Sequence, residues 1–85
     1  MTATVTNLIQ IHDSVALIQD LQVVEFMTEL PILLRRGQVG TVVEAYENGA
    51  AFEVEFSRSD GQPYALISVA AEQLMPLYYE AIYSS

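Results

Sequence analysis

RRGQVGTVVEAYENGAAFEVEF (residues 35–56) contains two extended segments separated by a turn. The first segment, GTVVEAY, is rich in β-branched and aromatic residues, and the ENG that follows it tolerates the positive φ of a chain reversal. The second segment, AFEVEF, alternates strictly, with Phe52, Val54 and Phe56 on one face and glutamates on the other. This period of two is typical of a half-buried strand. The stretch therefore predicts a β-hairpin that presents an apolar face to the core.

The flanking segments predict the remaining strands. Asp60 and Gly61 mark a tight turn, Pro63 is expected to interrupt the ladder, and residues 64–69 form the next strand. Residues 70–74 suit one 3-10 turn, and residues 75–77 add a last short strand. The first strand is expected at residues 9–17, with residues 23–27 as the alternative. The sequence thus predicts an all-β protein whose five short strands form a small closed barrel.

Two glycines and the chain end carry further structural expectations. Gly37 and Gly40 are expected to serve backbone geometry, through positive φ or close approach of neighbouring strands. Near the end of the chain, Tyr79, Ile82 and Tyr83 would lie on one side of a short helix. Because this tail is more apolar than a solvated segment, we expect it to dock onto the barrel or onto a second copy.

Length and composition restrict the class of protein. A chain of 85 residues forms one domain, and a domain of this size buries only about 60 to 65% of the surface of its unfolded chain. Of the residues, 52% are hydrophobic, yet no run approaches the roughly 18 apolar residues of a membrane span. The first residues lack the features of a signal peptide, which favours a cytoplasmic protein. The absence of cysteine excludes disulfides, thiolate catalysis and cysteine-ligated zinc.

The charge balance argues against one class of partner. Eleven acidic residues outnumber three arginines, there is no lysine, and the formal net charge is −8. Nucleic-acid binding requires cationic side chains that neutralise phosphates, so we expect no nucleic-acid partner. The same acidity is expected to serve solubility or to attract a basic protein.

Three segments together resemble the pattern of a known bacterial family. They are DSVALIQDL, LRRGQVGTVVEAY and AFEVEFSRSDGQPYALISVAAEQLMPL, and the resemblance covers roughly residues 9–77. The chain resembles the family described as domain of unknown function DUF4926. The resemblance implies a Src-homology-3-like barrel with no established activity. On this basis residues 1–77 form the barrel domain, with an N-terminal extension (1–8) and an inserted segment (about 22–30), and residues 78–85 form a C-terminal tail.

No arrangement of residues predicts catalysis, and we expect that the protein is not an enzyme. His12 is the only histidine, and on a strand it would point away from its neighbour Asp13, so the two could not share a metal ion. Glu53 and Glu55 share a strand face that is expected to be solvated. The serines lack a base that would activate them. The sequence therefore predicts no catalytic, metal or cofactor site.

Binding of a protein partner is the function that the sequence favours. Arg35 and Arg36 form the only basic pair, and they are expected to contact Glu44 or Glu47, to lie in solvent, or to anchor a carboxylate. The tyrosines offer aromatic contact surface. The candidate partner-binding residues are Arg35, Arg36, Tyr46, Tyr64, Tyr79 and Tyr83.

We therefore expect a non-catalytic interaction module that binds a protein partner, or another copy of itself as a homo-oligomer, through its apolar insertion and tyrosine-rich tail. One alternative is an antitoxin-like or immunity-like protein that neutralises a basic effector. Another is an accessory subunit of a metabolic complex. No membrane association is expected.

Overall fold

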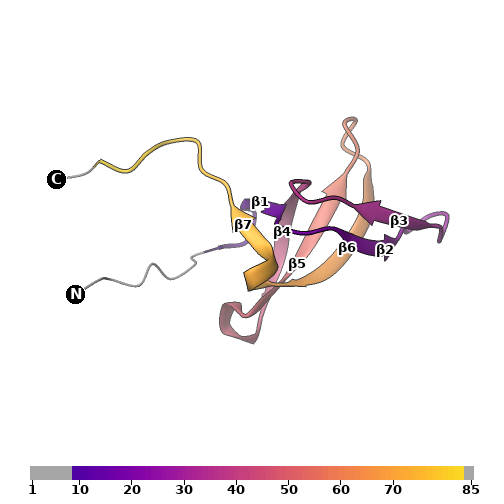
Figure 1. The fold of residues 1–85 in the computed structure, drawn as a ribbon, viewed down its shortest axis with the longest axis horizontal. Helices are drawn as coiled ribbons and strands as arrows, with labels where there is room; N and C mark the ends of the chain where they lie inside the picture. The colour runs from indigo at the N-terminus through magenta and orange to yellow at the C-terminus, as the bar shows by residue number, and fades with distance from the viewer. Residues whose placement is uncertain (1–8, 84–85) are drawn as a thin grey trace.

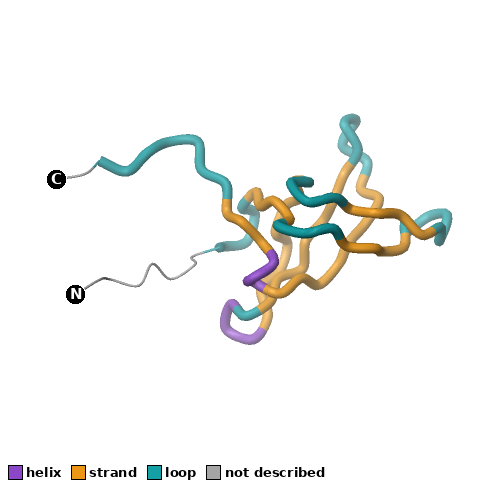
Figure 2. The backbone as a smooth tube through the Cα atoms, viewed as in Figure 1, coloured by secondary structure: helices purple, strands orange, loops and turns teal. Residues whose placement is uncertain are grey.

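Short strands joined by turns make up residues 9–83, the part of the chain that this computed structural model describes (Figures 1 and 2). Within these residues there is no α-helix, and the predicted all-β class is confirmed. The strands are β1 (Ser14–Leu17), β2 (Leu21–Val24), β3 (Pro31–Leu34), β4 (Val39–Tyr46), β5 (Ala51–Ser57), β6 (Pro63–Ala70) and β7 (Leu74–Pro76), and the 3-10 turns are η1 (Glu47–Gly49) and η2 (Ala71–Gln73).

The strands form two antiparallel sheets. The larger sheet has the order β6-β5-β4-β1-β7, and the smaller one is the hairpin of β2 and β3. In the larger sheet β6 and β7 are the two edges, so strand pairing does not close the predicted barrel. The predicted β4–β5 hairpin is confirmed, and its η1 turn has positive φ at Glu47, Asn48 and Gly49 (52°, 57° and 90°). The expected 3-10 turn before the last strand is also present.

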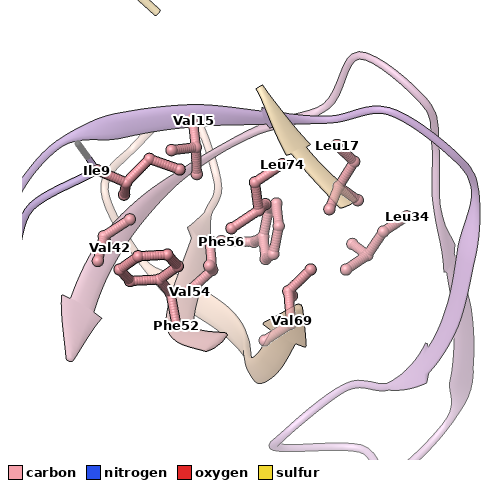
Figure 3. Close-up of a cluster of buried hydrophobic side chains, with 11 residues drawn as sticks. Ile9, Val15, Leu17, Leu34, Val42, Phe52, Val54, Phe56, Val69 and Leu74 are labelled. Carbon is pink, nitrogen blue, oxygen red and sulfur yellow. The ribbon is translucent and has the colours of Figure 1, made fainter. Parts of the chain in front are cut away.

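The core lies on the inward face of β5 and its neighbours (Figure 3). Phe52, Val54 and Phe56 are all at most 1% exposed, which confirms the period-two prediction. In Figure 3 the side chains of Val15 on β1 and Val42 on β4 point toward the same cluster. Among the described residues no polar side chain is buried. Hydrophobic burial is therefore the main interaction within this core.

The predicted first strand is only partly correct. We expected residues 9–17, but β1 covers only its last four residues, Ser14–Leu17. Residues 10–13 form a turn instead, in which the Gln10 amide donates to the Asp13 carboxylate at 2.9 Å and His12 has a φ of 79°. The turn chemistry of the aspartate overrides the apolar pattern at this point. His12 consequently lies in a turn and not on a strand.

Three further expectations are corrected. The alternative first strand (23–27) overlaps β2, which pairs only with β3, a strand that the sequence analysis missed. Pro63 begins β6 and pairs with Ser57 instead of interrupting the ladder. The register of the two strands shifts between Phe56 and Ser57, so no amide hydrogen is needed from the proline at this point. Residues 77–83 form no helix, and their side chains are exposed, so the tail does not dock onto the domain.

Both glycine expectations are confirmed, each by a different constraint. Gly37 has a φ of 90°, in the region that favours glycine. Gly40 on β4 has no room for a side chain. A Cβ atom there would lie 2.6 Å from the Val54 Cγ1 atom and 3.0 Å from the Glu55 carbonyl oxygen.

Gly40→Ala should therefore destabilise the fold by about 1 to 3 kcal/mol, the usual cost of overpacking a core. Urea unfolding of both proteins measures the difference. Gly61→Asn is the matched control, because no atom lies within 4 Å of the Cβ position at Gly61 and asparagine is among the side chains least strained at a positive φ, which is 89° here. We expect the control to cost less than about 1 kcal/mol. Equal stability of Gly40→Ala and wild type would contradict the close approach.

Candidate functional site

The β2–β3 hairpin is apolar on both of its faces. Its inner face is formed by the opposed pairs Leu21–Leu34 and Val23–Ile32, and all four side chains contact the core. Because strand side chains alternate, Val24 and the opposed pair Gln22–Leu33 lie on the outer face. Hydrophobic burial of the inner face explains why the hairpin folds against the larger sheet.

Large apolar side chains remain exposed on the outer face of the hairpin and on its turn. We name these side chains the hairpin patch. They are Val24, Phe26, Met27, Leu30 and Leu33, and their exposed fractions range from 44% to 79%. Figure 1 shows that the tip of this hairpin projects on the side of the molecule opposite β7. The hairpin patch is therefore accessible to another molecule.

An ion pair ties the hairpin tip to the turn between β5 and β6. The Arg58 guanidinium donates to the Glu25 carboxylate at 2.9 Å, and it lies 6.0 Å from the centre of the Tyr64 ring. The Phe26 amide donates to the Tyr64 carbonyl oxygen at 3.1 Å. The Thr28 hydroxyl donates to the same glutamate at 2.6 Å. These contacts hold the hairpin patch in one orientation.

The environment of Glu25 favours its charged form. The hydrogen bond from Thr28 has the largest effect and holds the pKa of the carboxyl below its ordinary value. Partial burial opposes this shift, and the hydrogen bond and charge of Arg58 add to it. A depressed pKa means that the contribution to stability is complete above the unfolded-state pKa of Glu25 and is lost as the pH falls through the folded-state pKa.

The two candidate arginines lie in the turn between β3 and β4. The Arg35 amide donates to the Gln38 side-chain oxygen at 3.0 Å, and the Arg36 amide donates to the Asp20 carboxylate at 2.7 Å. The expected ion pairs with Glu44 or Glu47 are absent from residues 9–83. Both side chains are exposed, so both guanidinium groups are available to a ligand.

Arg36 also lines a shallow open pocket at the end of β1. The pocket has a volume of about 450 Å³. Its other lining residues are Leu17, Ile18, Gly37 and Met75. We name it the Arg36 pocket. A single cation beside aliphatic side chains suits a ligand that is apolar but carries one carboxylate.

The candidate tyrosines occupy separate places. The Tyr46 hydroxyl, on β4, donates to Glu53 at 3.3 Å, and partial burial followed by the Glu53 and Glu44 charges raises the pKa of this phenol. Tyr64, on β6, is half-buried and accepts a hydrogen bond from the Gln38 side-chain amide. Tyr79 and Tyr83 lie in the tail and are fully exposed. The structure therefore does not bring the predicted site residues together.

Four residues of the hairpin patch lie in the apolar insertion (about 22–30) through which the sequence predicted partner binding, but none of them was named as a candidate, and Leu33 on β3 lies outside that segment. The PILL that forms β3 was the overlooked pattern, since a second apolar run beside LQVV permits a hairpin with two apolar faces. In residues 9–83 no group of three or more metal-binding side chains is close enough to hold an ion. Nor does any helix among them have the length and apolar character needed to cross a membrane.

One comparison with known proteins gives a match. A protein-family model described as "Domain of unknown function (DUF4926)" matches residues 11–76. No curated protein and no solved structure matches the chain. The match covers β1 to β7 and so includes both the hairpin patch and the Arg36 pocket.

The ion pair generates a test of how the hairpin is held. Glu25→Gln removes the charge that Arg58 and Thr28 contact, so the Phe26 amide should exchange its hydrogen faster than in wild type. In wild type the same acceleration should appear as the pH falls through the folded-state pKa of Glu25, after correction for intrinsic exchange.

Glu29→Gln is the matched control, because it makes the same charge change in the same turn and the Glu29 side chain has no hydrogen bond or ion pair within residues 9–83. The control should leave the exchange of the Phe26 amide unchanged. If both variants accelerate exchange equally, the ion pair does not hold the hairpin.

Proposed function

The chain belongs to the DUF4926 family, and on that premise we propose that it is a non-catalytic protein-interaction module that binds its partner through the hairpin patch. One observation carries the proposal: the β2–β3 hairpin uses one apolar face for the core and leaves the large apolar side chains of the hairpin patch exposed on its other face and its turn. Burial of the inner face is sufficient to explain why the hairpin packs on the larger sheet. The apolar side chains of the outer face are not needed for that packing, and we assign them to partner binding.

The size and chemistry of the hairpin patch support a protein partner. A contiguous exposed apolar surface marks an interaction site more often than a structural one, and its burial gains about 25 cal/mol per Å². Phe26 and Met27 at the tip are residue types that are enriched in protein interfaces. The contacts of Glu25 with Arg58 and Thr28 also restrict the tip before binding, which lowers the entropy lost on association.

Charge supports a basic partner. Glu44 and Glu53 lie directly opposite each other on β4 and β5, and Glu55 lies on the same strand face as Glu53. Like charges in opposed positions destabilise a sheet, so this arrangement serves folding poorly. Together with the net charge of −8, it attracts a cationic protein at long range and raises the association rate.

We further propose that the fold is a Src-homology-3-like barrel. Support comes from the strand order β6-β5-β4-β1-β7, from the η2 turn before β7, and from the hairpin inserted between β1 and β4. On this reading the segment at residues 22–30 belongs to the long first loop of the barrel. The cysteine-free sequence also fits our proposal of a cytoplasmic site of action.

The test is affinity capture from the native host with wild type and two variants, Met27→Glu and Leu33→Glu, followed by quantitative mass spectrometry. Each variant places a charge in the hairpin patch and should reduce the partner's affinity about tenfold or more, a loss of about 1.4 kcal/mol. Both positions are exposed, so thermal unfolding should remain close to that of wild type.

Ile11→Glu is the matched control, since it places the same charge on a similarly exposed apolar side chain in the turn before β1. It should retain the partner that both hairpin variants lose. A partner retained equally by all four proteins would refute binding through the hairpin patch. Retention of RNA in place of a protein would refute the proposed partner class.

A further inference from the structure

A second apolar surface lies on the tail, far from the hairpin patch. Tyr79, Ile82 and Tyr83 are between 94% and 103% exposed, and Tyr78 is 76% exposed. Figure 1 shows the tail running away from both sheets after β7. These four large side chains expose apolar surface within a short segment. Burial of that surface against another molecule would be favourable in free energy.

The Arg36 pocket has the complementary composition. Its walls include Ile18 and Met75, which are apolar and partly exposed. On the adjoining outer face of the large sheet, Val39 and Met75 flank the buried Ala16, and their exposed side chains continue this apolar surface. Arg36 contributes a guanidinium with no ion pair within residues 9–83.

The tail carries one charge that matches this pocket. Glu80 is exposed and lies between Tyr79 and Ile82, so the tail presents a carboxylate flanked by apolar side chains. A guanidinium binds a carboxylate with two parallel hydrogen bonds. Charge and apolar surface are therefore complementary between the tail and the Arg36 pocket.

The direction of the chain decides which tail can reach the pocket. β7 runs antiparallel to β1, and the Leu77 amide donates to the Ser14 carbonyl oxygen, so the tail leaves at the start of β1. The Arg36 pocket lies beside Leu17 and Ile18, at the other end of β1. To return there, the tail would need a tight reversal, yet residues 77–83 contain no glycine, proline, asparagine or aspartate.

We propose that the tail of a second copy of this chain occupies the Arg36 pocket. Glu80 of one copy pairs with Arg36 of the other, and Tyr79 and Ile82 contact its Ile18 and Met75. Each copy supplies one tail and one pocket, so reciprocal exchange closes a two-fold dimer. This contact does not use the hairpin patch, so the dimer and the proposed partner binding can fail independently.

The test exchanges the two charges and measures the mass in solution by sedimentation, from about 1 µM to about 500 µM, a range that reveals a micromolar Kd. Wild type should dimerise. Arg36→Glu and Glu80→Arg should each weaken dimerisation about tenfold or more, because each places like charges together. An equimolar mixture of the two variants should dimerise again, since both contacts in the mixed dimer then join opposite charges.

Arg35→Glu is the matched control for Arg36→Glu, because it makes the same charge change one residue away and Arg35 does not line the pocket. It should dimerise like wild type. Three results would each overturn the proposal: a wild type that stays monomeric over the whole range, single variants that dimerise like wild type, or a mixture that stays monomeric. The last result would show that Arg36 and Glu80 do not pair between two copies.

Discussion

Burial of one face of β5 is the constraint on which the rest of the structure depends. Phe52, Val54 and Phe56 fill the centre of the core, and β4 and β6 must pair on either side of them. The packing between β4 and β5 is closest at Gly40, where β4 passes so near to Val54 that a methyl group would not fit. A bulge in β4, between Val42 and Glu44, then lets the register change after the close approach.

The small size of the core links stability to the candidate binding surface. Residues 9–83 contain no α-helix that could cover the larger sheet, and the inner face of the β2–β3 hairpin covers it instead. Leu34 of this hairpin is 1% exposed and belongs to the core cluster (Figure 3). The hairpin cannot be made polar throughout without loss of that core, but nothing in folding requires its outer face to be apolar. The outer face is therefore the part of the hairpin to which the proposed partner binding is assigned.

The sequence analysis was accurate where the chain obeys local rules. The positive-φ turn at residues 47–49 and the alternation on β5 depend on neighbouring residues only, and both are confirmed. It was wrong at residues 10–13 and at the tail, where apolar spacing was taken to indicate a strand and a helix. In the first case Asp13 bonds the backbone and forms a turn. In the second, no packing partner within the domain stabilises a helix of that length.

The sequence by itself determined the all-β class, the central hairpin, the core face of β5, the two glycine positions and the family. These follow from residue type and periodicity, which act over a few residues. Tertiary structure alone decided the pairing of β2 with β3, the exposure of the hairpin patch and the separation of the predicted site residues. The contact of Glu25 with Arg58 joins residues that are 33 positions apart in the sequence. Arg36 and Met75, which line one pocket, are also far apart in the sequence. Such contacts depend on how the strands pack against one another, and no local pattern encodes that packing.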